Sequence, residues 1–289
     1  MLRVAVPNKG SLAEPASRML REAGYRQRSQ ARELVLHDPD NDTEFFFLRP
    51  RDIATYVGSG QLDVGITGRD LLLDSGVTAR ELMPLGFGAS TFRFAAIPGT
   101  ASSTAEIAGL RVATSYPGLV GQHLADRGIE ASVIRLDGAV ETSVRLGVAD
   151  VIADVVETGS TLRQAGLEVF GEPILHSEAV LIRGVGDGAV PPDTGPLEVA
   201  IDQLQRRLNG VMVAATYVIV DYDVPAGLVE KACAVTPGIE SPTVSPLHDP
   251  AWVAVRALVP RPDTNKVMDE LYDLGARGIL VTDIHACRL

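Results

Sequence analysis

One stretch of the sequence places an acid inside an apolar run, just before a turn rich in glycine and hydroxyl groups. Residues 151–162 read VIADVVETGSTL, with Asp154 in the run and Gly159 in the turn. A lone carboxylate in such a run is costly to bury without donors, and a ribose offers two adjacent hydroxyls. A turn that opens a helix points several N–H groups at one anion. The stretch therefore indicates a sugar-phosphate site, and an ordinary strand-to-helix turn is the alternative.

The turn that follows Asp154 has a composition that suits a phosphate group. Backbone N–H groups from Glu157 to Thr161 and three hydroxyls provide the donors. It is not a Walker loop, because the G-x-x-x-x-G-K-[ST] spacing is missing. Besides Asp154, the residues that we predict to contact the substrate here are Val155, Glu157, Thr158, Gly159, Ser160 and Thr161.

A second candidate loop, PNKGSLAEP, follows the first apolar run of the chain. Ser11 and Glu14 have the spacing of a capping box, which predicts that a helix begins at Leu12. Lys9 adds a positive charge near this helix start, and Gly10 permits close approach of the backbone to a ligand. The loop is therefore a phosphate-site candidate, although Ser11 could serve only as a helix cap.

Three more side chains lie where predicted strands end, which is where α/β sheets bind ligands. Arg49 could grip a phosphate with two parallel N–H bonds, or form a salt bridge at the rim. Asp70 could bond to a base or ribose, or cap a helix. Tyr116 could stack on a base or bind phosphate through its hydroxyl, or be partly buried for packing alone.

Alternating strands and helices must position these residues. Short apolar runs at 2–7, 44–50, 62–68, 92–98, 110–117, 132–138 and 150–156 alternate with helical patterns at 11–25, 51–60, 117–127 and 138–146. This βαβ order predicts a parallel sheet covered by helices. A faint similarity also links the stretches 53–70 and 141–158, because Gly60 and Asp63 match Gly147 and Asp150, and coincidence is the alternative explanation. We interpret this similarity as two alike lobes around a cleft, joined by crossings near 90–98 and 177–182.

The C-terminal part follows a different order. A Gly/Pro-rich segment at 184–196 precedes a helix that we expect to stop at Gly210. Strands at 217–225, 241–247, 252–260 and 278–284 and helices at 226–235 and 264–275 then give a βαββαβ order. This is the ferredoxin-like arrangement.

Composition restricts the function. The 289 residues are 46% hydrophobic and 22% charged, as in an ordinary globular protein of two or three domains, and the net charge is −11. Such acidity argues against a nucleic-acid or membrane-surface binder. The sequence also favours a soluble cytoplasmic protein. It has two cysteines without zinc-like spacing, and it lacks a signal-like or membrane-length apolar stretch.

The chain resembles the long form of ATP phosphoribosyltransferase over nearly its whole length. The resemblance rests on residues 4–12, 45–72, 135–162, 177–182 and 240–247. One departure concerns the phosphate loop, which carries one acid, Asp154, where commoner phosphoribosyltransferases carry two, with Glu157 following later. The family transfers the phosphoribosyl group of phosphoribosyl pyrophosphate (PRPP) to N1 of ATP, in the first step of histidine biosynthesis.

The resemblance implies an α/β fold with two periplasmic-binding-protein-like lobes around a cleft and a C-terminal ACT-like domain. We expect the first lobe at 1–90 and 180–211, the second at 91–179 and the regulatory domain at 212–289. The resemblance also implies Mg²⁺, for which no protein ligand is evident from the sequence, and dimers that assemble into hexamers. Lys9 and Arg49 would neutralise the leaving pyrophosphate and Asp154 would orient the sugar, with no residue required as a general base.

The resemblance further implies feedback inhibition by histidine, bound between ACT-like domains at Asp223, Thr243, Leu258 and Gly278. Asp223 could instead cap the helix that begins near Pro225. Two other functions are the alternatives for the whole chain. A prephenate dehydratase also joins two lobes to an ACT domain, but its Thr-Arg-Phe signature is interrupted here by Phe92, between Thr91 and Arg93. A non-catalytic solute-binding protein would share the lobes alone.

Overall fold

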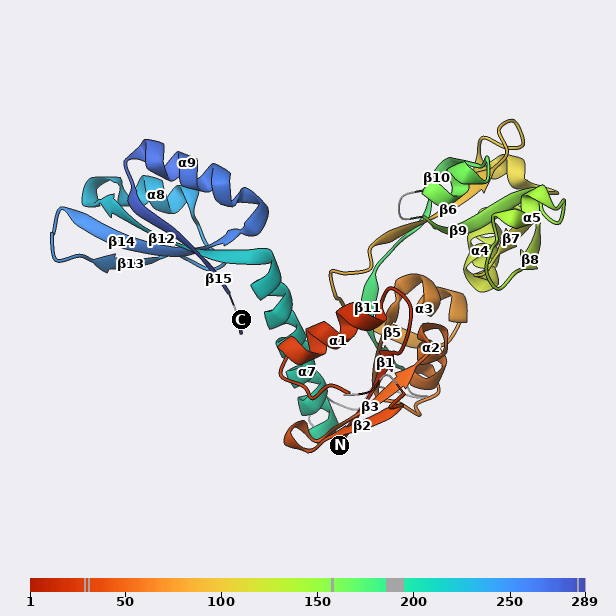
Figure 1. The fold of residues 1–289 in the computed structure, drawn as a ribbon, viewed down its shortest axis with the longest axis horizontal. Coiled ribbons are helices and arrows are strands. Elements are labelled where there is room, and N and C mark those ends of the chain that lie inside the picture. Colours follow the sequence, from red (N-terminus) through yellow and green to blue (C-terminus); the bar gives the residue numbers. More distant parts are fainter. Residues whose placement is uncertain (29, 31, 157–158, 186–194, 285, 289) are drawn as a thin grey trace. The chain divides into compact units, whose positions relative to one another are not determined.

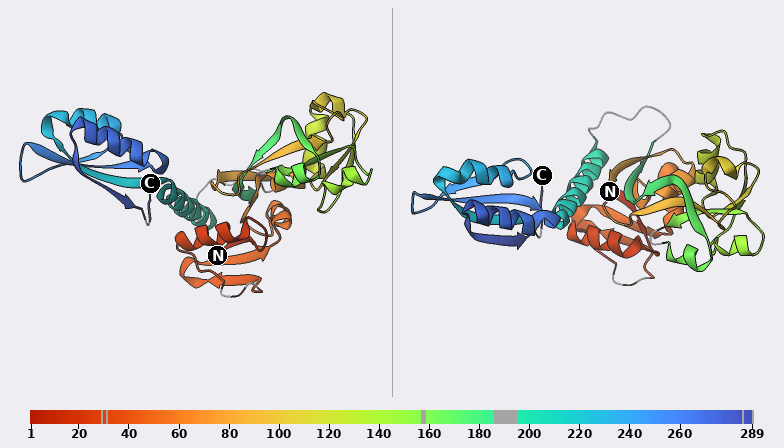
Figure 2. Two further views of the ribbon diagram at one scale, coloured as in Figure 1. Left: turned by 45° about the horizontal axis from the view of Figure 1, so that its top comes forward. Right: turned by 90° about the horizontal axis from the view of Figure 1, so that it is seen from above.

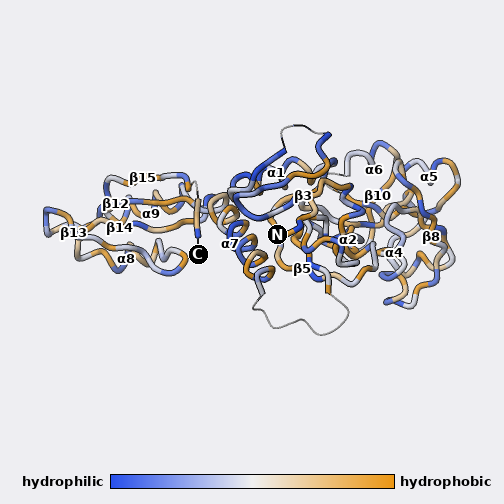
Figure 3. The backbone as a smooth tube through the Cα atoms, turned by 90° about the horizontal axis from the view of Figure 1, so that it is seen from below, coloured by the Kyte–Doolittle hydropathy of each residue, from blue (hydrophilic) through white to orange (hydrophobic). Residues whose placement is uncertain are grey.

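The computed structural model describes residues 1–28, 30, 32–156, 159–185, 195–284 and 286–288. The chain forms two compact units, Met1–Gln205 and Arg206–Leu289. The first unit contains two sheets and the second contains one (Figure 1). Hydrophobic residues recur along the strands of all three sheets (Figure 3), so each sheet builds its own core.

Sheet A is the sheet of the first lobe and has the order β2-β3-β1-β4-β11-β5. Its centre is parallel, and β11 lies antiparallel between β4 and β5. All five residues of β4 are buried, as expected for a strand covered on both faces. The strands are β1 (Leu2–Pro7), β2 (Val35–Asp38), β3 (Thr43–Leu48), β4 (Val64–Gly68), β5 (Ala79–Pro84) and β11 (Ala179–Gly184), and the α-helices are α1 (Ala13–Glu22), α2 (Pro50–Gly58) and α3 (Arg69–Ser75).

Sheet B is the sheet of the second lobe and has the order β10-β6-β9-β7-β8. Phe92 and Phe94 of β6 are fully buried against α4, and the other face of the sheet packs against Leu162 of α6. The strands are β6 (Ser90–Ala96), β7 (Arg111–Thr114), β8 (Ser132–Arg135), β9 (Val151–Val156) and β10 (Glu168–Ser177), and the α-helices are α4 (Pro117–Ala125), α5 (Thr142–Arg145) and α6 (Ser160–Gln164).

The two lobes share one topology. Strands β3-β1-β4-β11-β5 of sheet A and β8-β7-β9-β6-β10 of sheet B match in order and direction. In the first lobe the Asp63 N–H donates to the Arg3 carbonyl at 3.0 Å, and the Asp63 carboxylate accepts from the Arg3 N–H at 2.7 Å. Asp150 and Arg111 repeat both bonds in the second lobe, at 2.9 and 3.0 Å. The faint internal similarity of the sequence is therefore a structural repeat.

The crossings between the lobes are shorter than the sequence predicts. Residues 90–96 form β6 inside sheet B, so the first crossing is the segment 85–89, and the prediction of a crossing at 90–98 is wrong. The second crossing is limited to Glu178, the single residue between β10 and β11, so the predicted crossing at 177–182 is too long. The two crossings run together, because the Leu85 N–H donates to the Ala179 carbonyl and the Ala179 N–H to the Phe87 carbonyl, both at 2.9 Å.

The second unit is ferredoxin-like, as the βαββαβ order predicts. Its antiparallel sheet has the order β13-β14-β12-β15, with α8 and α9 on one face (Figure 2). The long helix α7 (Pro196–Thr216) leads into β12 (Tyr217–Pro225), α8 (Val229–Val235), β13 (Thr243–Pro246), β14 (Trp252–Pro260), α9 (Thr264–Leu274) and β15 (Arg277–Asp283). In the core, the buried Tyr222 hydroxyl lies 2.7 Å from the Thr236 hydroxyl. Short 3-10 helices lie at Pro39–Asn41, Thr104–Ile107, Ala226–Leu228 and Arg261–Asp263.

Two helix ends differ from their prediction. Helix α7 continues through Gly210 to Thr216, so Gly210 does not end it. The glycine instead permits close packing, because a Cβ there would lie 2.0 Å from the Cys287 carbonyl oxygen. Helix α1 begins at Ala13 and no described side chain caps it, so the capping box of Ser11 and Glu14 is wrong. The chain turns into α1 around Gly10, whose carbonyl accepts from the Ala13 N–H, and this turn leaves Ser11 ahead of the N-cap, Leu12.

None of the described helices combines the length and the apolar character needed to cross a membrane.

Candidate active site

A cavity of about 190 Å³ collects residues from both lobes and from the crossings. The turn after β1, the start of α3 and the crossings contribute from one side, and Tyr116 and Val155 of the second lobe contribute from the other. The residues that line it are Lys9, Gly10, Ser11, Leu12, Pro50, Gly68, Asp70, Leu71, Gly88, Ser90, Tyr116, Val155 and Ser177. Six residues that the sequence singles out are among them.

The turn after β1 presents an exposed cation to this cavity. Lys9 is exposed and has no ion-pair partner among the described residues. The turn itself is fixed, because the Asn8 N–H donates to the Leu48 carbonyl at 2.8 Å. Lys9 is therefore a free positive charge on a fixed backbone, which suits a negatively charged ligand.

Asp70 is buried at the point where the lobes meet. Its Oδ1 accepts from the Ser177 hydroxyl at 2.9 Å, and that hydroxyl accepts from the Asp70 N–H at 3.0 Å. No side-chain bond of Asp70 caps α3, whose N-cap is Gly68, so the capping interpretation is wrong. The Ser177 bond occupies one carboxylate oxygen, and the side chain lines the cavity.

Tyr116 is the N-cap residue of α4, and its ring lies between Phe92 and Arg51. The Phe92 ring meets it edge-on at 5.0 Å between centroids, and the Arg51 guanidinium carbon lies 4.9 Å from the ring centroid. Burial raises the pKa of the Tyr116 hydroxyl, and the charge of Asp70 and a hydrogen bond with it raise the pKa further. The hydroxyl is therefore neutral at physiological pH and can donate a hydrogen bond.

A second cavity of about 280 Å³ adjoins the first, since Val155 lines both. Asp154 faces it from β9, together with Glu141, Val156, Leu162 and the residues Gly159, Ser160 and Thr161. Burial raises the pKa of Asp154, and the nearby charges of Glu141 and Asp70 raise it further. The Val155 N–H, which donates to Asp154 Oδ1 at 2.8 Å, opposes this rise.

The cation opposite Asp154 does not pair with it. Arg93 lies across from Asp154 in the β6–β9 ladder, but its Nη2 donates to the Gly171 carbonyl at 2.6 Å. Within the described part of the chain, Asp154 has no ion-pair partner. A partly buried carboxylate with one backbone donor keeps acceptor capacity for a ligand that brings hydroxyl groups.

The turn after β9 has the backbone of a loop-to-helix junction. Gly159 is the N-cap of α6 and has φ +67°, a left-handed conformation that favours glycine. The Ser160 and Thr161 residues that follow line the cavity. Glu157 and Thr158, which we also predict in this site, lie outside the described residues.

Arg49 differs from the other predicted residues that the structure describes, although the next residue, Pro50, lines the first cavity. It is the N-cap of α2, directly after β3, and lines neither of the two cavities. Ion-pair partners of Arg49 are absent from the part of the chain that the structure describes, so the rim salt bridge of the alternative interpretation is not formed.

Glu141 is a candidate that the sequence interpretation missed. It lies at the N-cap position of α5, 13 residues before Asp154, and faces the same cavity. No spacing rule connects two acids that come from a helix start and a strand.

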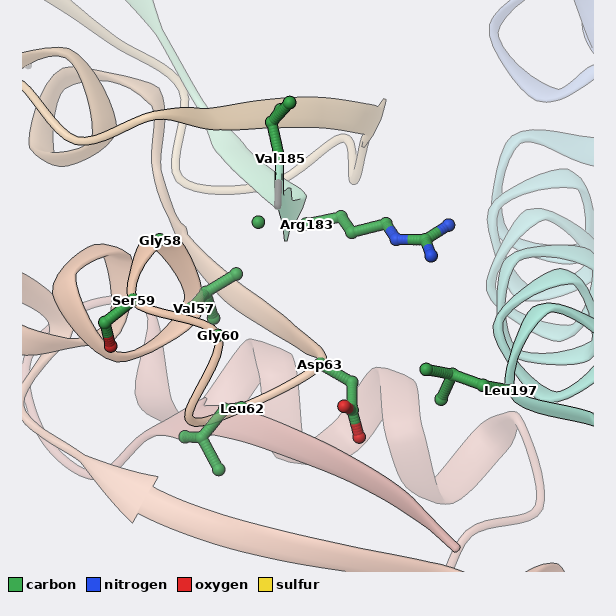
Figure 4. Close-up of a pocket in the computed structure, with 10 residues that line it drawn as sticks. Val57, Gly58, Ser59, Gly60, Leu62, Asp63, Arg183, Val185 and Leu197 are labelled. Carbon is green, nitrogen blue, oxygen red and sulfur yellow. The ribbon is translucent and has the colours of Figure 1, made fainter. Parts of the chain in front are cut away.

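A further cavity of about 310 Å³ involves none of the predicted residues. It lies between the end of α2, the loop 59–63, the end of β11 and the start of α7 (Figure 4). Arg183 extends from β11 toward α7, where it pairs with Glu198 at 2.6 Å from Nη1 to Oε2. The pairing of its one lining cation favours a structural role.

Among the described residues no three His, Cys, Asp or Glu side chains are grouped to hold a metal ion. The charges of Glu141 and Asp70 raise the pKa of Asp154, but the three acids do not form such a group.

Two equivalent α/β lobes with cavities lined by residues of the turns after their strands, followed by a ferredoxin-like unit, define a two-lobed α/β protein with an appended small domain. Residues 49–210 match the family model described as ATP phosphoribosyltransferase, and residues 214–286 match HisG, C-terminal domain. The chain belongs to the ATP phosphoribosyltransferase family. Its reaction is the transfer of the 5-phosphoribosyl group of PRPP to N1 of ATP, which gives phosphoribosyl-ATP and pyrophosphate in the first step of histidine biosynthesis.

Relatives support this assignment over the full length. The ATP phosphoribosyltransferase of Pseudarthrobacter chlorophenolicus is 68% identical over 289 residues, and that of Mycobacterium tuberculosis is 58% identical over 289 residues, each with 100% of both chains covered. The ATP phosphoribosyl transferase (HisG:HisZ) complex from Thermotoga maritima is 25% identical with a TM-score of 0.61 and covers 73% of this chain and 98% of that chain. The alternatives of a prephenate dehydratase and a solute-binding protein are not favoured.

Proposed function

We propose that the two adjoining cavities hold the substrates of the reaction side by side. PRPP places its ribose on Asp154 and its 5-phosphate on the turn that contains Gly159, Ser160 and Thr161, with Glu157 and Thr158 of the same turn. The adenine of ATP occupies the cavity of Asp70 and Tyr116. The observation that carries the proposal is that the two cavities share Val155, so the ligands would meet there.

In this arrangement the chain acts mainly by positioning and by charge. The lone pair of adenine N1 attacks C1 of the ribose, and the bond from C1 to the pyrophosphate oxygen breaks. Positive charge develops on the sugar, near Asp154 and Glu141, and negative charge on the leaving pyrophosphate, near Lys9. N1 carries its own lone pair, so no residue has to remove a proton.

Mg²⁺ fits as a substrate-held ion that neutralises pyrophosphate charge. The family is ATP- and PRPP-utilising and generally Mg²⁺-dependent. Asp70, Asp154 and Glu141 are the carboxylates of the described site that could contact the ion directly or through water. Arg49 stays a proposed pyrophosphate ligand. Because Arg49 lines neither cavity, the pyrophosphate would have to reach beyond their lining to contact it.

We also propose that the ferredoxin-like unit, residues 212–289, is an ACT-like module that binds histidine as a feedback inhibitor. Buried and partly exposed residues alternate along β12, and Asp223 is one of the partly exposed ones. Its side chain is therefore on the sheet face turned away from α8 and α9. Leu258 and Thr243 lie on the same face by the strand registers. Gly278 is adjacent, since a Cβ there would lie 3.6 Å from Asp223 Oδ2. Neither helix start that follows β12 has a side-chain cap, so the capping interpretation of Asp223 is wrong.

The remaining assignments stay proposals. The first catalytic lobe is 1–90 with 180–211, the second is 91–179, dimers assemble into hexamers, and the enzyme works in the cytoplasm. The division of the strands between sheets A and B supports the two lobes.

Lys9→Ala tests the active-site assignment. Lys9 is exposed and without a described ion-pair partner, so the melting temperature should stay close to that of the wild type. Loss of a charge-assisted bond of about 1.5–3 kcal/mol should lower kcat/KM for PRPP roughly ten- to a hundredfold. Lys231→Ala, at an exposed position of α8, is the control and should leave both values unchanged. Wild-type kinetics in Lys9→Ala would remove this residue from the site.

A further inference from the structure

A contact between the lobes exists besides the crossings, and it joins the end of α3 to the start of α4. The Asp74 carboxylate of the first lobe accepts from the Gly118 N–H at 2.9 Å and from the Leu119 N–H at 3.2 Å, both through Oδ1. Asp74 thus satisfies two free N–H groups at the N-terminus of a helix in the other lobe. Its side chain is only 7% exposed, so the contact excludes water.

Arg51 extends this contact to Tyr116. Its Nη1 lies 2.6 Å from Asp74 Oδ2, and its guanidinium carbon lies 4.9 Å from the Tyr116 ring centroid. A single cation of α2 therefore touches the acid of the first lobe and the ring of the second. Because Tyr116 directly precedes Pro117, the first residue of α4, the same contact that holds the helix start also holds the ring.

Gly118 permits this approach. A Cβ at Gly118 would lie 2.4 Å from the Asp74 carbonyl oxygen, which is backbone and cannot turn away. Gly118 lies in the first turn of α4 and its φ is not positive, so the local conformation does not require glycine. The residue is needed for the distance between the lobes.

We propose that Arg51, Asp74 and Gly118 form an interlobe clasp that positions Tyr116 in the cleft, a role that rests on the proposed function of Tyr116. Helix α3 is then fixed at both ends. Its N-terminal end binds the end of β10 through Asp70 and Ser177, and its C-terminal end binds α4 through Asp74. The lobes cannot rotate about the crossings without moving the clasp, so the clasp sets the distance between Tyr116 and Asp70. Asp74 and Gly118 are positioning residues that act through Tyr116.

Two glycines of the same helix give a matched test. Gly118→Ala keeps every charge and places a methyl group against Asp74, whereas Gly121 has open space around its Cβ direction. Both changes favour an isolated helix, because alanine has the higher helix propensity. A role limited to helix stability therefore predicts the same behaviour for both variants.

The expected kinetic result separates them. Gly118→Ala should lower kcat/KM for ATP and PRPP at least tenfold, since a misplacement of about 1 Å costs up to about a hundredfold. Gly121→Ala should keep the wild-type values. Asp74→Asn keeps an acceptor for the two N–H groups but loses the charge that holds Arg51, so it should reduce kcat/KM in the same direction.

Amide hydrogen exchange of the substrate-free enzyme measures the clasp without catalysis. Peptides that contain Gly118 and Leu119 should exchange faster in Asp74→Asn and in Gly118→Ala than in the wild type and in Gly121→Ala. Unchanged exchange, or faster exchange with wild-type kinetics, would overturn the proposal. Tyr116→Ala tests separately the proposed function of Tyr116, on which the clasp proposal rests. Wild-type kinetics in that variant would remove Tyr116 from the site. The exchange data would still report whether the clasp forms.

Discussion

At the scale of single residues, Asp154 combines a cost in stability with a role in binding. Burial raises its pKa, so in the substrate-free protein its protonated form is favoured by folding. The stability that this proton contributes is fully present below the unfolded pKa, near 3.8, and is lost as the pH rises through the folded pKa. At neutral pH the ionised carboxylate therefore destabilises the empty enzyme.

Asp154→Asn should consequently melt at a higher temperature than the wild type at pH 7. The difference should shrink as the pH falls, because the wild-type carboxyl becomes protonated as the pH drops through its raised pKa. The same change weakens acceptance from ribose hydroxyls, so kcat/KM for PRPP should fall about ten- to a hundredfold, from roughly 1.5–3 kcal/mol. Thermal unfolding from pH 4 to 8, together with steady-state kinetics, measures both effects.

Asp137→Asn is the control, because this acid of the second lobe is 76% exposed. It should change neither the melting temperature nor the kinetics appreciably. A lower melting temperature for Asp154→Asn at pH 7 would show that Asp154 is structural in the empty enzyme, and unchanged kinetics would exclude it from the ribose site.

At the scale of secondary-structure elements, the repeat explains why the turns carry the site. Aligning Arg3 with Arg111 places Gly10 opposite Gly118 and Asn8 opposite Tyr116, each in the turn after the first strand of its lobe. In the sequence, the match of Asp63 with Asp150 likewise places Asp70 opposite Glu157, after β4 and β9. The cleft is therefore built from equivalent turns, at the carboxyl ends of equivalent strands.

The repeat also gives a stability prediction. Asp63 and Asp150 make equivalent bonds to Arg3 and Arg111, but the Asp63 side chain is 12% exposed and that of Asp150 is 31% exposed. Asp63→Asn should therefore destabilise by about 1–3 kcal/mol, and Asp150→Asn by up to about 1 kcal/mol. Thermal or urea unfolding of both variants beside the wild type measures the difference. Equal losses, or a larger loss for Asp150→Asn, would contradict the view that burial decides the strength of this bond.

Most of the strands and helices could be predicted from the sequence, because hydrophobic periodicity and turn residues are local signals. The strands around Asp154, Asp70 and Tyr116 and the βαββαβ unit were predictable in this way. Gly210 was not, since its role depends on the carbonyl of Cys287, which is far away in the chain. Glu141 and the Asp74 clasp were likewise hidden, because tertiary packing alone brings a helix start to a strand or to another lobe.

At the scale of the whole molecule, the chain carries two units with separate cores, and a ligand of one can regulate the other only through coupling. If histidine binds the ferredoxin-like unit, it does not occupy the substrate site of the other unit, so excess PRPP should not relieve its inhibition. Asp223 is the proposed partner of the histidine ammonium group. Its position on the sheet face away from α8 and α9 leaves it available to a ligand or to a second copy of the unit.

Asp223→Ala should keep catalysis without histidine and raise the inhibition constant about ten- to a hundredfold, from the roughly 1.5–3 kcal/mol of one charge-assisted bond. Asp221→Ala is the matched control: Asp221 lies two residues earlier on the same face and strand, but it already pairs with Arg256 at 2.7 Å. Because that pair is exposed, its loss should change the inhibition constant little. Histidine titrations at low and saturating PRPP measure both variants. Equal inhibition constants for Asp223→Ala and the wild type, or inhibition that saturating PRPP removes, would exclude Asp223 from a regulatory site.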